Sequence, residues 1–274
     1  EDIVADDYYI IFDASTSPDA STYGFSPSNV GTSGEDSDAN ASGQTSPFSF
    51  DPTMGDDLTL DAGLVPMADI GNYVWIDTDQ DGEQDGTETG IGGVDVTLYD
   101  ALGNVVATTT TAADGSYLFP DVAAGDYYVG YDVSGVTGDY IFTQIDQGND
   151  SNDSDANSSG FTPVFNFDPS NGDDLTIDAG VYPVANIGDY VWLDTDGDGI
   201  QDGTEIGMQG VTVTLYDDFG NVVATTTTDG SGAYEFTDIP NGDYYLTFDA
   251  STSNTPGADM FPTSPQGSGD GTND

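Results

Sequence analysis

Short runs of alternating apolar and polar residues recur along the chain. In the run 94–99, Val94, Val96 and Leu98 alternate with polar neighbours, so that one face of a strand would be apolar. Such runs are rich in Val, Ile, Thr, Tyr and Phe and are bounded by Gly, Asp, Asn and Pro, as strands usually are. No apolar period of 3.6 residues is sustained, which argues against long helices. In one stretch of the chain we expect strands at 72–77, 93–99, 104–110, 116–120, 126–132, 140–145, 163–167 and 174–178. This many short antiparallel strands predicts an all-β fold built from β-sandwiches.

The pattern repeats at an interval of 117 residues. The run Ile-Gly-Asn-Tyr-Val-Trp at 70–75 returns as Ile-Gly-Asp-Tyr-Val-Trp at 187–192, and Asp-Ser-Asp-Ala-Asn at 36–40 returns at 153–157. An interval of this length is about one domain. We therefore expect residues 1–66 to be the C-terminal part of one repeat, 67–183 a complete repeat, and 184–274 the N-terminal part of a further repeat. A sheet edge left open by a missing strand could accept a strand from another copy of the chain. The alternative is that the chain is a segment of a longer array of repeats, which needs no strand donation.

The charge of the chain is extreme and one-sided. Its 274 residues include 51 Asp and Glu and no Lys, Arg or His, so its formal charge is −51. Acidity of this kind can mean disorder, but 36% hydrophobic and 11% aromatic residues are enough for packed cores. Repulsion between carboxylates opposes compaction, and no side chain can offset it. A compact fold would therefore need bound cations.

Two acidic segments have the spacing of a twelve-residue calcium loop. Oxygen ligands at positions 1, 3, 5, 7, 9 and 12, with Gly at position 6 for the sharp turn, surround a cation that takes six to eight oxygens. Position 7 contributes only its backbone carbonyl, so Ile is acceptable there. Magnesium fits less well, because it demands a tight octahedron and keeps its waters. The expected ligands are Asp77, Asp79, Asp81, Glu83, Asp85 and Glu88 in the first loop, and Asp194, Asp196, Asp198, Ile200, Asp202 and Glu205 in the second.

A second acidic cluster is less specific. Asp153 and Asp155 lie in one acidic loop, and Asp36 and Asp38 occupy the equivalent places 117 residues earlier. These carboxylates could bind further calcium ions, with Asp132 or Asp178 as partners from elsewhere in the repeat. The alternative is a solvated polar loop, which is a common use of Asp.

Together these motifs resemble a known family. The run 187–192, the acidic loop, Gly-Val-Thr-Val-Thr-Leu-Tyr-Asp at 210–217, Gly-Asp-Tyr-Tyr at 242–245 and Asp-Ala-Gly at 178–180 are similar to the B-type repeats of serine-aspartate repeat surface proteins, the SdrD B-like domains. The resemblance covers essentially the whole chain. It implies tandem Ig-like sandwiches of the collagen-adhesin B type, stiffened by several calcium ions, at least one for each complete repeat. It also implies an extracellular location, at the cell surface or in a surface fibre, as part of an adhesin stalk or filament. Related sandwiches that use a Lys–Asn isopeptide bond have no counterpart here, because the chain has no Lys.

The residue inventory narrows the remaining functions. Without His, Cys or Lys there is no catalytic triad, thiolate or Schiff base, and repeated carboxylates suit structure better than a single active site, so we expect no enzyme. Nucleic acid is not expected as a partner, since binding it needs Lys or Arg. No apolar run is long enough for a membrane span. The expected partners are calcium and neighbouring repeats or other copies of the chain. A carbohydrate- or ice-binding adhesion module remains the alternative, through Trp75 and Trp192 or the Thr runs 108–111 and 225–228.

Overall fold

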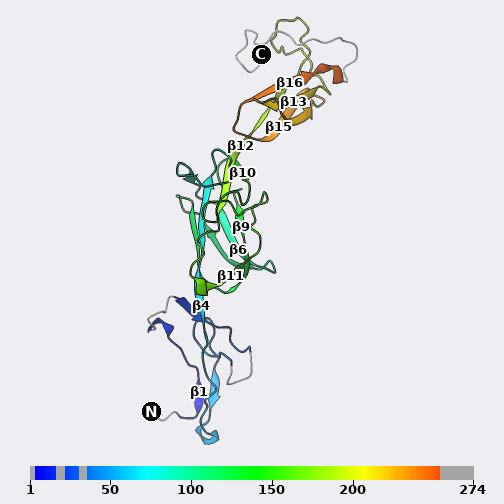
Figure 1. Cartoon of the computed structure of the whole chain (residues 1–274). Coiled ribbons are helices and arrows are strands. Elements are labelled where there is room, and N and C mark those ends of the chain that lie inside the picture. Colours follow the sequence, from blue (N-terminus) through cyan, green and yellow to red (C-terminus); the bar gives the residue numbers. More distant parts are fainter. Residues whose placement is uncertain (1–3, 17–21, 31–35, 254–274) are drawn as a thin grey trace. The chain divides into compact units, whose positions relative to one another are not determined.

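A computed structural model describes residues 4–16, 22–30 and 36–253, which form two compact units (Figure 1). Unit 1 comprises residues 1–137 and 142–182, and unit 2 comprises residues 138–141 and 183–274. The other residues of the predicted first and third repeat segments lie outside the described part of the chain. Within that described part, no helix is long and apolar enough to cross a membrane.

The N-terminal segment of unit 1 contributes short strands. Tyr8 lies opposite Phe48 in an antiparallel pair, and Tyr127 lies opposite Phe165 in the same kind of pair further along the chain. The sequence repeat is thus accompanied by a repeated strand pairing. The elements are β1 (Asp6–Tyr8), the 3-10 turn η1 (Ala14–Thr16), β2 (Tyr23–Phe25), β3 (Phe48–Phe50) and η3 (Pro52–Met54).

The rest of unit 1 is an Ig-like β-sandwich. One sheet is built on β4, which pairs with β2, β5 and β8 in antiparallel fashion, and the other has the order β11-β9-β6-β7. The strands are β4 (Leu64–Ile76), β5 (Thr89–Gly90), β6 (Asp95–Asp100), β7 (Val105–Thr110), β8 (Ser116–Ala123), β9 (Gly125–Asp132) and β11 (Phe165–Phe167), with the 3-10 turn η4 (Pro169–Asn171). Of β10 (Asp139–Phe142), residues 139–141 belong to unit 2 and Phe142 to unit 1.

The core lies between these two sheets. Its members include Ile70 and Val74 of β4, Phe119 of β8, and Val96 and Leu98 of β6, and all five are almost completely buried. The polar residues between Val94 and Leu98 lie on the other face, so the predicted alternation is confirmed. Burial of such side chains stabilises a fold by roughly 1.5–3 kcal/mol each, which is the main force available to a chain that repels itself.

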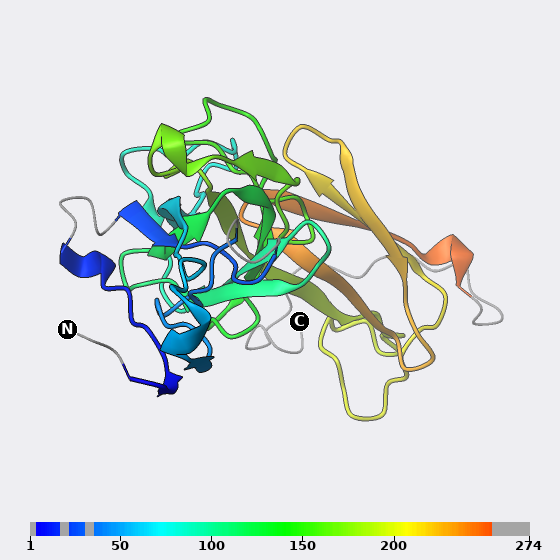
Figure 2. The same cartoon turned by 90° about the horizontal axis from the view of Figure 1, so that it is seen from below.

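Unit 2 repeats the first half of this arrangement. Residues 184–190 of β12 (Ala179–Tyr190) pair with β15, and a second sheet has the order β14-β13-β16. Figure 2 shows β12 in yellow-green and the strands of the second sheet in yellow to orange. The core side chains are Val213, Leu215, Phe236 and Ile239. The further elements are β13 (Thr212–Asp217), β14 (Val222–Thr227), β15 (Ala233–Pro240), β16 (Tyr244–Asp249) and η5 (Ala250–Thr252).

The strand predictions fail in one region. Residues 174–178 form no strand, and β12 begins only at Ala179. The backbone of 174–178 instead bonds to separate parts of the unit: Gly71 N donates to Asp174 O, and Asp155 N donates to Asp178 O. Residues Ala179–Val181 then pair with β4 in parallel, which departs from the expected antiparallel arrangement.

Trp75 and Trp192 differ in burial. Trp75 is completely buried in unit 1, as expected of a core side chain. Trp192, its equivalent in unit 2, is only half-buried.

Candidate metal centre

The first twelve-residue loop begins where β4 ends and is organised around Asp77. This carboxylate is completely buried. Its Oδ1 accepts the Gln80 N–H at 2.6 Å, and its Oδ2 accepts the Gly82 N–H at 3.0 Å and the hydroxyl of Thr143. Gly82 has φ +85°, a left-handed conformation that Gly adopts without steric cost. The backbone therefore turns sharply at position 6, as predicted for a calcium loop.

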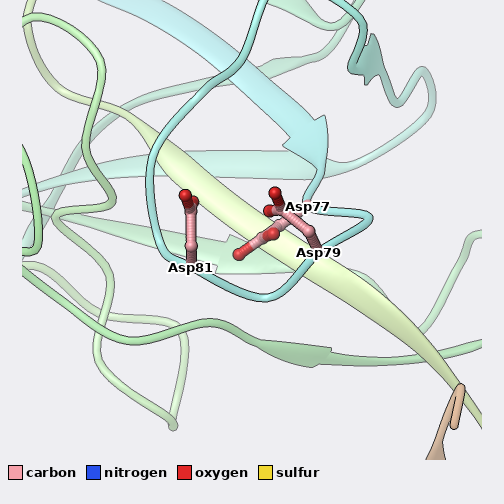
Figure 3. Close-up of side chains that lie close together, drawn as sticks. All are labelled: Asp77, Asp79 and Asp81. Atoms are coloured by element: carbon pink, nitrogen blue, oxygen red, sulfur yellow. The ribbon is translucent and has the colours of Figure 1, made fainter.

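Three carboxylates converge in this loop. One oxygen from each of Asp77, Asp79 and Asp81 lies within 4.8 Å of the others (Figure 3). Asp79 and Asp81 are exposed to solvent, whereas Asp77 is not. Because the protein has no positively charged side chain, nothing in the chain offsets the mutual repulsion of these three carboxylates. The group could hold a metal ion, and a divalent cation would reverse the sign of the interaction.

Glu88, at position 12, closes the first loop. Its Oε1 accepts the Thr78 N–H and hydroxyl, and its Oε2 accepts the Asp85 N–H at 3.1 Å. The structure thus places Glu88 at the entrance of the loop, but not within the close group of three carboxylates. Glu83 N donates to Asp81 at 2.9 Å, which holds position 7 against position 5.

The second loop, in unit 2, has the same hydrogen-bond plan. Asp194 accepts the N–H groups of Gly197 and Gly199, and Glu205 accepts those of Thr195 and Asp202. The backbone donors of Thr195 and Asp202 lower the pKa of Glu205, so it stays ionised.

The close group differs between the two loops. In the second loop it consists of Asp194, Asp196 and Glu205, and Asp198 accepts the Ile200 N–H instead of joining it. Asp85 and Asp202, at position 9, belong to neither close group among the described residues. Positions 1 and 3 converge in both loops, position 5 in the first loop and position 12 in the second.

The two loops also differ at position 4. Gln80 has φ +64°, and its counterpart Gly197 has φ +76°. A side chain in this left-handed conformation costs roughly 1–2 kcal/mol, which Gly avoids. The first loop therefore carries a strained Gln where the second loop carries an unstrained residue.

The second acidic loop of unit 1 lies directly against the first. Glu83 and Asp153 form an antiparallel bridge, Gln84 N donates to Asn152 O at 2.6 Å, and Ser154 N donates to Gly82 O at 3.2 Å. Sequence reasoning placed ligands in each loop separately and did not foresee that the two loops touch. The contact brings the acidic residues of both loops into one region of the unit.

Asp153 is the most enclosed carboxylate of this second loop. It is 6% exposed, and its Oδ2 accepts the Gly148 N–H at 3.3 Å. Its Oδ1 is buried and has no hydrogen-bond partner among the described residues, and the same is true of Asn152 Oδ1. Buried oxygens without a donor are costly, and a cation would satisfy both. Asn152 was not predicted from the sequence, since nothing in its spacing marks it.

Asp155 is paired with Asp178 in the interior. Asp178 is completely buried and accepts the Tyr73 N–H and the Asn72 side-chain amide, both at 3.1 Å, while Asp155 accepts the Asp178 N–H at 2.7 Å. Burial, together with the charge of Asp155, raises the pKa of Asp178 to about 8. Burial, together with the charge of Asp153, raises the pKa of Asp155 to about 7. Of the two partners considered from the sequence, the structure brings Asp178 to this cluster, whereas Asp132 caps a turn at Ser134.

The N-terminal counterpart repeats part of this geometry. Asp38 accepts the Asp61 N–H at 3.0 Å, which matches the bond from Asp178 to Asp155. This pair lies in more exposed surroundings, and Asp36 beside it is half-buried. Asp36 and Asp38 therefore form a more open version of the second acidic cluster.

Comparison with known proteins gives a consistent result. Residues 68–181 and 185–274 match the SdrD B-like domain family. Serine-aspartate repeat-containing protein D of Staphylococcus aureus (strain Newman) is 42% identical over 85% of this chain and 17% of its own length. Serine-aspartate repeat-containing protein F of Staphylococcus epidermidis is 44% identical over 73% of this chain and 11% of its own length. The chain thus spans less than a fifth of either relative.

A solved structure also aligns with the chain. The streptococcal ancillary pilin covers 88% of this chain and 73% of its own, with 14% identity and a TM-score of 0.31. That score is too low to bear on the fold.

Proposed function

Because the chain belongs to the family of SdrD B-like domains, we propose that it is a calcium-stabilised structural segment of an extracellular stalk, fibre or filament. The observation that carries the proposal is the group of three carboxylates within 4.8 Å in each twelve-residue loop, in a chain without any cationic side chain. The location at the cell surface follows from the family.

Calcium acts in this proposal as the missing positive charge. An ion in the first loop would take oxygens from Asp77, Asp79 and Asp81, the carbonyl of Glu83, and the carboxylate of Glu88. Two of these groups are already anchored, since Asp77 is held by backbone N–H groups and Glu88 by those of Thr78 and Asp85. Binding would therefore tie the end of β4 to the rest of the loop and remove the repulsion that opens it.

A second ion would bind where the two loops of unit 1 touch. The unpartnered oxygens of Asp153 and Asn152 support this site, and the Glu83 side chain packs beside Gly148 next to them. Asp155 extends the same acidic region toward the interior. The complete repeat, 67–183, would then hold more than one ion, and Asp36 and Asp38 would hold one in the segment 1–66.

The partners of the chain in this proposal are further repeats. The segments 1–66 and 184–274 are parts of repeats that continue the array on either side of 67–183. Neighbouring copies of the chain could assemble in the same way, including by donation of a strand to an open sheet edge. The role is structural and requires no catalysis.

Calcium removal tests the proposal. We expect an excess of chelator to lower the melting temperature of the whole chain steeply and to enlarge its particle dimensions in X-ray scattering. Calcium should restore both properties, and magnesium at the same ionic strength should restore little of either. A melting curve that is the same in chelator and in calcium would refute the proposal.

A further inference from the structure

A hollow of about 510 Å³ lies beside the first twelve-residue loop, within unit 1. Its volume falls inside the range of about 300–1,000 Å³ that is usual for small-molecule sites. Its apolar lining includes the half-buried rings of Phe142 and Tyr182. Its polar lining consists of Gln80, Thr143, Gln144, Gln147, Asn157 and Ser158.

The lining has an unusual chemistry for this protein. Among the described residues no carboxylate lines the hollow, although the chain has 51 of them. Side-chain amides offer both donors and acceptors, and a hydroxyl does the same. A metal ion would find stronger ligands in the adjacent carboxylate loops, and an anion would be repelled by the charge of −51. The remaining class of ligand is uncharged and rich in hydroxyl groups.

The three glutamines belong to this repeat and are not required by the fold, whereas Asn157 recurs as Asn40. At the positions 117 residues away, Gln144 is matched by Pro27, Gln147 by Val30, and Gln80 by Gly197. The backbone pairing is nevertheless shared, because Ile145 bridges Ser154 just as Ser28 bridges Ser37. The same backbone pairing thus forms with or without the glutamines.

The conformation of Gln80 supports a role of this lining in ligand binding. It keeps a side chain at a left-handed position where Gly197 occupies the equivalent place in the second loop. Strained residues of this kind concentrate at binding sites. Its backbone N–H is held by Asp77 at 2.6 Å, and the Gln147 side-chain amide donates to the Ile145 carbonyl at 2.7 Å, so the backbone at Gln80 and the side chain of Gln147 are both held in place.

We propose that this hollow is a binding site for a neutral carbohydrate. Its amides would bond the hydroxyl groups of a sugar ring, and Phe142 or Tyr182 would contact an apolar face of the ring. The site goes beyond the calcium-dependent structural role, and it would give one repeat of the stalk a contact with a neutral glycan.

The test is a titration of the whole chain, saturated with calcium, against neutral oligosaccharides of hexoses and N-acetylhexosamines, with sialylated and sulfated oligosaccharides alongside. We expect saturable binding of at least one neutral oligosaccharide and none of the anionic ones. The double variant Gln144→Ala with Gln147→Ala should weaken that binding by about tenfold or more, because each lost hydrogen bond contributes a substantial part of such a factor. Gln209→Ala, an exposed glutamine of unit 2, is the matched control and should bind as the wild type does.

Gln80→Gly provides an independent variant. It introduces the residue found at the equivalent position of the second loop and relieves the strain at Gln80, so calcium stoichiometry should be kept and the melting temperature kept or raised, while sugar binding falls several-fold. If the double variant does not fold, Gln80→Gly alone tests whether the hollow binds the sugar. The proposal would be overturned if none of the neutral oligosaccharides bound saturably. It would also be overturned if one bound but neither Gln80→Gly nor the double variant weakened its binding. Neither result would affect the calcium role, which the stoichiometry reports separately.

Discussion

Replacing Asp79 with Ala separates two effects of the negative charge in the first loop: repulsion between its carboxylates, which destabilises unit 1, and the proposed calcium binding, which stabilises it. Asp79 is exposed, and one of its oxygens lies within 4.8 Å of an oxygen of Asp77 and of Asp81. At the dielectric constant of water, two unit charges at 4.8 Å repel by about 1 kcal/mol. Asp79→Ala removes two of the three repulsive pairs in the group, so without calcium it should stabilise unit 1 by about 2 kcal/mol at low salt.

In the presence of calcium, the wild type should be more stable than Asp79→Ala, the reverse of the order without calcium. An ion present at a thousand times its dissociation constant stabilises the wild type by about 4.1 kcal/mol, and a loop that has lost calcium gains nothing. The variant should then be about 2 kcal/mol less stable than the wild type. For a unit of this size, the melting temperature should rise by roughly 4–8 °C in chelator and fall by a similar amount in calcium.

Differential scanning calorimetry in 20 mM salt, with chelator or with calcium, measures both arms. Asp139→Ala removes an exposed acid that belongs to neither close carboxylate group, and should shift the melting temperature little in either buffer. A decrease caused by Asp79→Ala in both buffers would refute the reasoning, because it would mean that Asp79 supports the loop without calcium. An equal increase in both buffers would refute it as well, because no calcium stabilisation would have been lost.

Two further predictions concern the second acidic cluster. In chelator, stability should fall as the pH rises from about 4 to about 8, because Asp155 and Asp178 hold their protons in the folded state up to pKa values of about 7 and 8 but release them near 3.9 when unfolded. Asp178→Asn should flatten that slope in chemical denaturation across this pH range, and an unchanged slope would show that other groups cause it. Asp153→Asn should reduce the calcium stoichiometry by one in calorimetric titration while the first loop still binds; an unchanged stoichiometry would exclude Asp153 as a ligand.

The strand pattern was largely predictable because side-chain alternation reports burial directly. Val94, Val96 and Leu98 alternate with polar residues, and the structure buries all three. The prediction failed at 174–178, where apolar and polar residues also alternate. There the Asp178 carboxylate accepts the Tyr73 N–H and the Asp178 N–H bonds to Asp155, so long-range polar contacts replace a strand ladder. Alternation alone cannot distinguish these two cases.

The candidate sites were predictable where their ligands are close in sequence. Asp77, Asp79 and Asp81 converge in the structure because the backbone turns at Gln80 and the N–H groups of Gln80 and Gly82 both bond to Asp77. The contact between this loop and the one containing Asp153 depends on backbone bonds between residues about 70 positions apart, such as Ser154 N to Gly82 O. No local spacing encodes such a contact. The repeated Asp-Ala-Gly at 61–63 and 178–180 was the available signal for Asp178, since the backbone N–H of Asp61 and that of Asp178 bond to the equivalent carboxylates of Asp38 and Asp155.

Anomalous diffraction from crystals grown in calcium tests the central claim most directly. The account predicts an anomalous peak in the first loop, with oxygens of Asp77, Asp79, Asp81 and Glu88 at about 2.3–2.6 Å from the ion. It predicts a matching peak in the second loop, at Asp194, Asp196 and Glu205. Loops that show no anomalous peak at saturating calcium, with the carboxylates bonded only to backbone N–H groups, would contradict it.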